Sequence, residues 1–303
     1  MNGRSEALPG QWARHGLIKR EKTRTMTPDS METLGGSTVQ HGKCSDRVYL
    51  MKLCPQDRGQ MVGRLDTLAR EKGYSKIFAK VPAPMEEEFL KGGYAVEARV
   101  PGLFNGHGEG LFMGKFFTSD RARVENGGLL DQVRAVALSR AGARGAVDSR
   151  FRVRPMEPGQ AGTMARLYGR VFASYPFPIM DPGFIKETMA SHVRYFGVFE
   201  GRDLVALSAA EVDMASLSAE MTDFATLPHM RGRGISDVLL STMGQAVGAL
   251  GIRTAYTIAR ATSYGMNIVF ARAGYRYGGM LVNNTHIAGA LESMNVWWAD
   301  ISD

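Results

Sequence analysis

The sequence predicts an α/β (α+β) protein in which a mixed, mostly antiparallel sheet is flanked by helices. Three observations predict this class. Strand-like and helix-like segments alternate along the chain, one such group of segments recurs near its end, and a glycine-rich turn joins a strand to a long amphipathic helix. With 303 residues, 44% of them hydrophobic, the chain is long enough for two domains or one large one.

Charge and cysteine content exclude several classes of protein. The 37 lysines and arginines against 30 aspartates and glutamates give a net charge of +7, which is too mild for a polybasic nucleic-acid tail. Cys44 and Cys54 form no CxxC pair, so we expect neither a disulfide framework nor a metal site. No apolar run reaches the ~18 residues of a membrane span. We expect a cytoplasmic protein with no membrane or nucleic-acid partner and no assigned oligomeric state.

The first half is expected to contain a tail, a small α/β unit and a linker. Residues 1–44 have few large apolar side chains and predict a disordered tail. Residues 45–117 predict strands and helices in alternation. Their order is a strand at 47–53, a helix at 60–72, a strand at 75–81, a short helix ended by Gly92-Gly93, and strands at 94–100 and 111–117. Residues 118–150 predict a helical linker.

A glycine-rich segment at residues 105–110 of this half has the composition of a phosphate-binding loop. A phosphate loop must lead into a helix, so that its free N–H groups point at the anion. This segment leads into an alternating strand instead. We therefore expect a hairpin turn.

The second half, residues 151–303, predicts a larger unit. Its long helix at 234–250 places apolar residues on one face, which is typical of packing against a sheet. The expected elements are strands at 151–156, 194–200, 204–213, 219–227, 252–260, 275–283 and 291–299, and helices at 159–172, 182–191, 234–250 and 264–273.

The two halves share an internal similarity. Residues 73–117 parallel residues 251–298, and both segments contain a Phe-x-x-x-Gly-Tyr element, at 89–94 and at 270–275. We interpret the first half as a partial copy of the last third. The alternative is that two unrelated α/β units share a helix-ending glycine.

The turn at residues 231–236 carries the most specific chemistry. Its sequence Arg-Gly-Arg-Gly-Ile-Ser follows a strand and opens the long helix, so unpaired N–H groups and the positive helix end converge on one point. Arg231 and Arg233 add charge that pairs with phosphate oxygens. The turn is interpreted as a pyrophosphate site, and a surface turn with two arginines is the alternative.

The pattern Arg231-x-x-Gly234-x-Ser236 between a strand and a long helix resembles the acetyl-CoA signature of the GNAT acetyltransferases. The resemblance covers residues 151–303 and implies a GNAT fold there, preceded by a smaller GNAT-like partial repeat. Ser236 stands where Gly or Ala is usual. The resemblance implies that acetyl-CoA is held by Phe224, Ala225, Thr226, Arg231, Gly232, Arg233, Gly234, Ile235 and Ser236.

Longer strings resemble the bacterial and archaeal beta-lysine N-acetyltransferases. They are Ala-Glu-Met-Thr-Asp-Phe-Ala-Thr-Leu-Pro at 219–228, Ala-Tyr-Thr-Ile-Ala-Arg-Ala at 255–261, and Glu-Ser-Met-Asn-Val-Trp at 292–297. The resemblance implies acetyl transfer to the side-chain amine of beta-lysine, which makes a neutral compatible solute for osmoadaptation. Two alternatives are another amine acceptor, such as α-lysine, a polyamine or a protein lysine, and a non-catalytic acyl-CoA sensor.

Acetyl transfer to an amine calls for a base, since an amine with a pKa of ~10.4 is protonated at neutral pH. Glu220 lies in the strand before the pyrophosphate turn, where GNAT enzymes often place that base. Asp223 is the alternative, expected on the opposite strand face because side chains alternate. The family's usual proton-donating tyrosine is replaced by Phe270, and Tyr264 is the substitute candidate.

A substrate with two amines and a carboxylate calls for acidic and amide side chains around it. The candidates are Glu211, Asp213, Asn283, Asn284 and Glu292. The first half lacks the Arg-x-x-Gly-x-Gly turn. We therefore expect it to bind no CoA, and to pack against the catalytic half or cover the substrate cleft.

Overall fold

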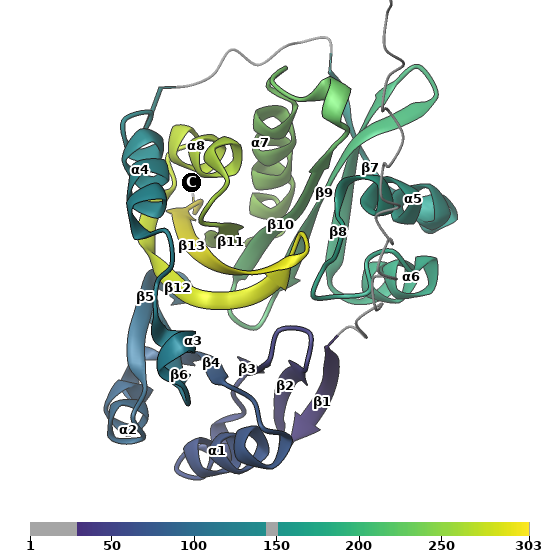
Figure 1. Ribbon diagram of the computed structural model, residues 1–303. Coiled ribbons are helices and arrows are strands. Elements are labelled where there is room, and N and C mark those ends of the chain that lie inside the picture. The colour runs from purple at the N-terminus through teal and green to yellow at the C-terminus, as the bar shows by residue number, and fades with distance from the viewer. Residues whose placement is uncertain (1–28, 144–150, 303) are drawn as a thin grey trace, which may run out of the picture.

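The structure is a computed structural model that describes residues 29–143 and 151–302. Its strands form one thirteen-stranded sheet in the order β1-β2-β3-β4-β6-β5-β12-β13-β11-β10-β9-β8-β7. Neighbouring strands are antiparallel except in the pairs β3–β4 and β10–β11. The expected mixed, mostly antiparallel sheet with flanking helices is confirmed (Figure 1). Among the described residues, none of the helices has both the length and the apolar character to span a membrane.

The first half follows the expected order of elements, with strand ends shifted by a few residues. The expected hairpin turn at 105–110 is present as a tighter turn between β5 and β6. The elements are β1 (Ser30–Leu34), β2 (Ser37–Gly42), β3 (Arg47–Lys52), α1 (Met61–Lys72), β4 (Lys76–Pro82), α2 (Glu86–Lys91), β5 (Ala95–Phe104) and β6 (Gly108–Phe116), followed in the linker by α3 (Ser119–Ala122) and α4 (Gly127–Leu138).

The expected tail at residues 1–44 is wrong for its last part. Residues 30–42 form the hairpin β1–β2, and β2 pairs with β3, so the small unit begins before residue 45. Strand β2 buries polar side chains, among them Ser37, Gln40 and His41. Backbone pairing and side-chain hydrogen bonds, rather than large apolar side chains, order this strand. Its composition is therefore polar and resembles that of a disordered tail. Residues 1–28 and 144–150 lie outside the described residues.

The second half also has the expected elements. The short strand β7 is limited to three residues, and β12 and β13 are longer than expected. The elements are β7 (Val153–Pro155), α5 (Ala161–Val171), α6 (Pro182–Ser191), β8 (Val193–Glu200), β9 (Asp203–Asp213), β10 (Ser218–Thr226), α7 (Ile235–Gly248), β11 (Thr254–Arg260), α8 (Tyr264–Arg272), β12 (Arg276–Ile287) and β13 (Ala290–Asp300).

The internal repeat is present and longer than the sequence indicates. The first half has the spatial order β1-β2-β3-β4-β6-β5, with β3 and β4 parallel. The second half has the order β8-β9-β10-β11-β13-β12, with β10 and β11 parallel. Chain order and the places of α1, α2, α7 and α8 correspond as well. The hairpin that the sequence predicts as a tail is therefore the counterpart of β8–β9.

The halves join through two corresponding strands, β5 and β12, which pair antiparallel at Ala98 and Gly279. Ala98 lies four residues after Tyr94, and Gly279 lies four residues after Tyr275, so the contact joins equivalent positions of the repeat. A Cβ atom at Gly279 would lie 2.2 Å from the carbonyl oxygen of Glu97, and its φ is 144°. Only glycine permits this close approach.

A bulge in β12 strengthens the joint. Between Leu281 and Thr285 the strand leaves its register with β13, and the three intervening residues contact the first half. Buried Lys76 of β4 donates to Val282 O at 2.7 Å and pairs with Glu97 at 2.7 Å. Arg121 of α3 donates to Asn283 O at 2.8 Å. The first half thus binds the β12 backbone through buried cations.

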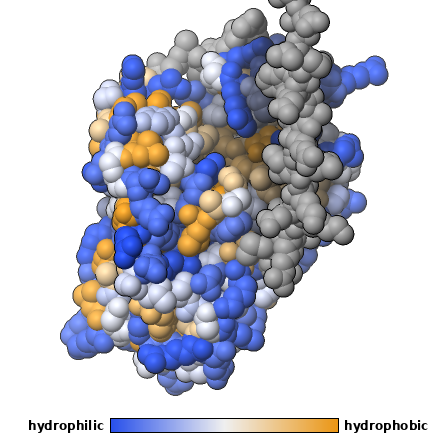
Figure 2. Space-filling model, in the orientation of Figure 1, coloured by the Kyte–Doolittle hydropathy of each residue, from blue (hydrophilic) through white to orange (hydrophobic). Residues whose placement is uncertain are grey.

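Three hydrophobic clusters occupy distinct places. One packs α1 and α2 against β3, β4 and β6, and another packs α5 to α8 against the strands of the second half. The third lies between the inner faces of the two halves and includes Tyr49, Phe78, Tyr256 and Leu281. In Figure 2 the hydrophobic residues on the visible face lie in small groups among hydrophilic ones. The site described next borders the third cluster.

Candidate active site

A pocket opens where the inner faces of the two halves meet. The first half contributes Arg47, Tyr49 and Met51 from β3 and Phe78 and Lys80 from β4. The second half contributes side chains from the strands β9 to β13 and from the segment before α6. These are Tyr175, Pro176, Phe177, Glu211, Glu220, Thr222, Asp223, Tyr256, Ile258, Asn284, Thr285, Ile287 and Met294. The first half therefore forms one wall of this pocket, and its role toward a substrate stays a prediction.

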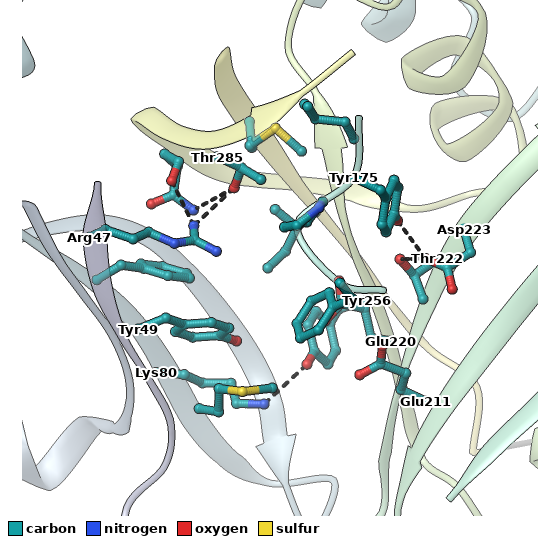
Figure 3. Close-up of a pocket in the computed structure, with 18 residues that line it drawn as sticks. Arg47, Tyr49, Lys80, Tyr175, Glu211, Glu220, Thr222, Asp223, Tyr256 and Thr285 are labelled. Carbon is teal, nitrogen blue, oxygen red and sulfur yellow. Dashed lines mark hydrogen bonds between the residues drawn. The ribbon is translucent and has the colours of Figure 1, made fainter. Parts of the chain in front are cut away.

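Equivalent positions of the repeat face each other across the pocket. In the parallel ladder of the first half Tyr49 lies opposite Phe78, and in that of the second half Glu220 lies opposite Tyr256. All four line the pocket. Figure 3 shows Arg47, Tyr49 and Lys80 on one side and Glu211, Glu220 and Asp223 on the other. The pocket therefore has a cationic wall and an acidic wall.

Glu220 and Glu211 form the centre of the acidic wall. They are direct partners in the antiparallel ladder of β10 and β9, so their side chains are neighbours on one face. Desolvation and then the charge of Glu211 raise the pKa of Glu220 to about 8, and desolvation also raises the pKa of Glu211. Two such neighbouring carboxyls titrate as a pair rather than independently. This is the environment of a proton-accepting group rather than of a surface ion pair.

Asp223 lies on the same wall, which corrects the expectation that it occupies the opposite strand face. The register of β10 against β9 shifts between Thr222 and Ala225, and Asp223 has a φ of 57°. The extra residue of this bulge turns the Asp223 side chain into the pocket. It accepts hydrogen bonds from Tyr175 and Thr222, while desolvation and then Glu211 raise its pKa to about 7.

The ladder between β10 and β11 is short. Their ladder contains the pairs from Ser218–Thr254 to Glu220–Tyr256, and beyond it the strands diverge. Phe224, Ala225 and Thr226 therefore run along β10 without a partner on β11. Phe224 packs edge to face against Phe270, with 5.6 Å between ring centroids. Backbone groups along this edge of β10 are available to an extended ligand.

The glycine-rich turn follows the unpaired end of β10 and leads into α7. Gly232 and Gly234 have φ values of 76° and 74°, and a Cβ at Gly232 would meet no atom within 4 Å. The first N–H groups of α7, at Ile235 and Ser236, have no intrahelical acceptor and project beyond the helix end. Arg231 donates to Thr226 O at 3.2 Å, and Arg233 is exposed, 3.9 Å from Glu200. These donors fit a pyrophosphate.

The corresponding place in the first half differs. Asp57 lies in the connection from β3 to α1, where its carboxylate accepts hydrogen bonds from Ser37 and Gly36 and pairs with Arg64. The Ser37 hydroxyl is the main reason that the pKa of Asp57 is lowered. A carboxylate therefore occupies the place that free N–H groups have in the second half, and the absence of CoA binding by the first half stays a prediction.

Of the remaining candidates, the pocket contains Asn284 but not the other four. Tyr264 is exposed at the start of α8, and Phe270 of the same helix is buried. Asp213 binds Ser216 in the turn between β9 and β10. Asn283 donates to the carbonyls of Arg121 and Arg123. Glu292 pairs with Arg260 and accepts from Thr262.

The sequence reasoning missed the cationic wall. Arg47, Lys80, Tyr175 and Tyr256 line the pocket, and Lys80 donates to the Tyr256 hydroxyl at 3.2 Å. A signal was available for two of them. Arg47 and Lys80 each lie in an apolar strand pattern, and a charge in a buried strand needs a partner. Tyr175 lies in an irregular segment and gives no such signal.

Comparisons with known proteins give relatives over most of the chain. It is 37% identical over 269 residues to the beta-lysine N(6)-acetyltransferase of Methanococcus maripaludis, which covers 88% of this chain and 96% of that protein. It is 31% identical over 231 residues to the N-acetyltransferase YodP of Bacillus subtilis, with 76% of this chain and 83% of that protein covered. No family model matches the chain.

Solved structures resemble half of the chain. The ribosomal-protein-S18-alanine N-acetyltransferase of Escherichia coli has 14% sequence identity and a TM-score of 0.44, covering 50% of this chain and 95% of that one. A spermidine/spermine N-acetyltransferase of Vibrio cholerae has 17% identity and a TM-score of 0.44, covering 51% and 96%.

Proposed function

Since this chain belongs to the beta-lysine N(6)-acetyltransferase family, we propose that it transfers the acetyl group of acetyl-CoA to the N6 amine of beta-lysine. The observation that carries the proposal is the pocket between the halves, in which three carboxyl groups face two cations. Beta-lysine has two ammonium groups and one carboxylate, so its charges complement both walls. The product loses one positive charge, which suits a neutral compatible solute made in the cytoplasm.

Glu220 is the proposed base. It lies at the last paired position of β10 and β11, immediately before the unpaired end of β10 that would hold the cofactor. An ammonium group cannot attack a thioester, so one proton must leave first. Glu220 in its ionised form accepts that proton, and its pKa of about 8 makes it a stronger base than an ordinary carboxylate. Asp223 and Glu211 stabilise the ammonium before the transfer.

Acetyl-CoA is the proposed co-substrate, with its pyrophosphate at the turn of Gly232 and Gly234 and its pantetheine arm along Phe224, Ala225 and Thr226. The free edge of β10 also supplies N–H groups for the thioester oxygen, which gains negative charge as the amine attacks. The neutral amine forms the C–N bond, the C–S bond breaks, and the thiolate leaves. Phe270 cannot protonate it, so the proton comes from the attacking nitrogen.

The test is an acetyl-transfer assay with the purified full-length chain. Thiol release from acetyl-CoA is measured with beta-lysine, α-lysine and spermidine, and NMR identifies which nitrogen carries the acetyl group. We expect beta-lysine to be the preferred acceptor and N6 the modified atom. Acetylation of α-lysine or spermidine with none of beta-lysine would contradict the proposal. Binding of acetyl-CoA without turnover of any amine would favour a sensor.

A further inference from the structure

Arg47 is a buried cation without a nearby counter-ion. It is 3% exposed, and no carboxylate of the described residues lies within 4.0 Å of its guanidinium. Asp29 acts on it electrostatically from farther away. Burying an unpaired charge destabilises the folded chain unless a partner compensates it. In a pocket wall, that partner is the ligand.

The hydrogen bonds of Arg47 leave one edge of its guanidinium open. Nη1 is fully used, since it donates to Asn284 O at 2.7 Å and to Thr285 Oγ1 at 2.9 Å. Nη2 has one long contact, 3.4 Å to Gln40 Oε1, and the buried Nε has no partner among the described residues. The Nε and Nη2 donors lie side by side, which is the geometry that binds the two oxygens of a carboxylate.

The orientation of this group is fixed by its surroundings. The guanidinium carbon lies 5.3 Å from the centre of the Tyr49 ring and 5.6 Å from that of Phe78. Figure 3 shows the group held by the Thr285 side of the pocket, across from the carboxyls of the second half. A preorganised guanidinium loses little entropy when it binds an anion.

A second unpaired group lies beside the first. The side-chain oxygen Oδ1 of Asn284 is buried and accepts no hydrogen bond from the described residues, and Asn284 is 1% exposed. Its backbone carbonyl is the acceptor of Arg47 Nη1. An open fork of donors next to an orphan acceptor fits a carboxylate with an ammonium group close by. That is the head group of an amino acid.

We propose that Arg47 and Asn284 form the receptor for the amino-acid head group, with Arg47 binding the carboxylate and Asn284 accepting from the neighbouring ammonium. The inference rests on the proposed function and deepens it. The two halves divide the substrate between them, since the first half reads the acid end while Glu220 of the second half deprotonates the distant amine. The enzyme therefore selects diamino acids over diamines.

The experiment compares beta-lysine with its carboxamide, in which the carboxylate alone is neutralised. For the wild-type protein we expect kcat/KM to be at least ~100-fold higher for the acid. Arg47→Met should lower kcat/KM for the acid by ~100-fold through KM, and should change that for the carboxamide by less than about threefold. Arg47→Lys, which keeps the charge but not the fork, should give an intermediate loss. The control is Arg70→Met, on the exposed face of α1.

The outcomes separate this inference from the proposed function. If the wild type acetylates the acid and the carboxamide equally well, the role of Arg47 is refuted while the activity stands. An equal loss on both compounds in Arg47→Met has the same meaning, because a structural defect does not distinguish them. If the wild type acetylates neither, the proposed function fails and this inference with it.

Discussion

The two halves of the molecule have the same topology and opposite chemistry. At one pair of ladder partners the second half has Glu211 and Glu220, where the first half has Gln40 and Tyr49. Two residues after Phe78 the first half has Lys80, and at the equivalent position of the second half, two residues after Tyr256, is Ile258. All of these residues except Gln40 line the same pocket. The repeated backbone thus places two faces against each other, and side-chain divergence gives each face its own charge.

The halves also differ in the turns that precede the corresponding helices α7 and α1. The turn before α7 presents positive-φ glycines, free N–H groups and two arginines, whereas the turn before α1 contains the ionised carboxylate of Asp57. The N–H donors of the first arrangement fit a pyrophosphate, whereas a carboxylate offers no such donors. From this difference we propose that one copy retains the chemistry of acetyl transfer while the other serves substrate recognition. The following predictions test that division.

The largest expected effect concerns the acidic wall. Glu220→Gln preserves the shape of the side chain but removes the base, so kcat/KM for beta-lysine should fall by ~1000-fold while acetyl-CoA binding persists. Tyr49→Phe, at the equivalent position of the first half, should cost less than about tenfold. Steady-state kinetics and calorimetric titration with acetyl-CoA measure the two effects. Similar losses in both variants would show that the halves share the catalytic role.

The next effect concerns the contact between the two halves, where Lys76 and Glu97 form a buried pair. Lys76→Met leaves Glu97 buried without its cation, so the free energy of unfolding should fall by about 3 kcal/mol. Urea unfolding followed by circular dichroism measures it. The control is Lys91→Met, since Lys91 forms an exposed pair with Glu87 within the first half and its loss should cost about 1 kcal/mol or less. An equally small loss for Lys76→Met would mean that the buried pair does not hold the halves together.

Much of this fold follows from the sequence. The Phe-x-x-x-Gly-Tyr elements locate the repeat because helix-ending glycines and buried aromatics recur at fixed spacing. The hairpin β1–β2 escapes prediction since its buried side chains are polar and its order comes from pairing with β3. Local pattern does not report which residues a strand will pair with.

The candidate site is predictable from the sequence only in part. Glu220, Asp223, Glu211 and Asn284 were expected at the site, and all four line the pocket. The opposite-face assignment of Asp223 fails because a bulge breaks the alternation that it assumes. Arg47 reaches Asn284 across 237 positions of sequence, because β5 pairs with β12 and the β12 bulge contacts the first half. The spacing of residues within one half carries no information about this contact with the other half.

The third prediction uses the pKa of Glu220. Below about pH 8 Glu220 is protonated and cannot accept a proton, so kcat/KM for beta-lysine should fall about tenfold for each unit of pH below that value. Above about pH 8 the profile should level off. Initial rates from pH 6 to 10 with saturating acetyl-CoA measure it. A rise that continues to the amine pKa of ~10.4 would mean that the free amine reacts without a base.

The smallest effect separates the two turns. Gly232→Ala forces a side chain into a left-handed conformation that costs ~1–2 kcal/mol, so the turn should relax and the Kd of acetyl-CoA should rise about tenfold. Gly59→Ala is the matched control, because Gly59 has a φ of 79° and, like Gly232, no atom within 4 Å of an added Cβ. The strain is the same in both variants, so a difference in Kd reports phosphate binding and not stability. If Gly59→Ala weakened acetyl-CoA binding as much as Gly232→Ala, the first half would also bind CoA. The proposal that only the second half binds the cofactor would then be wrong.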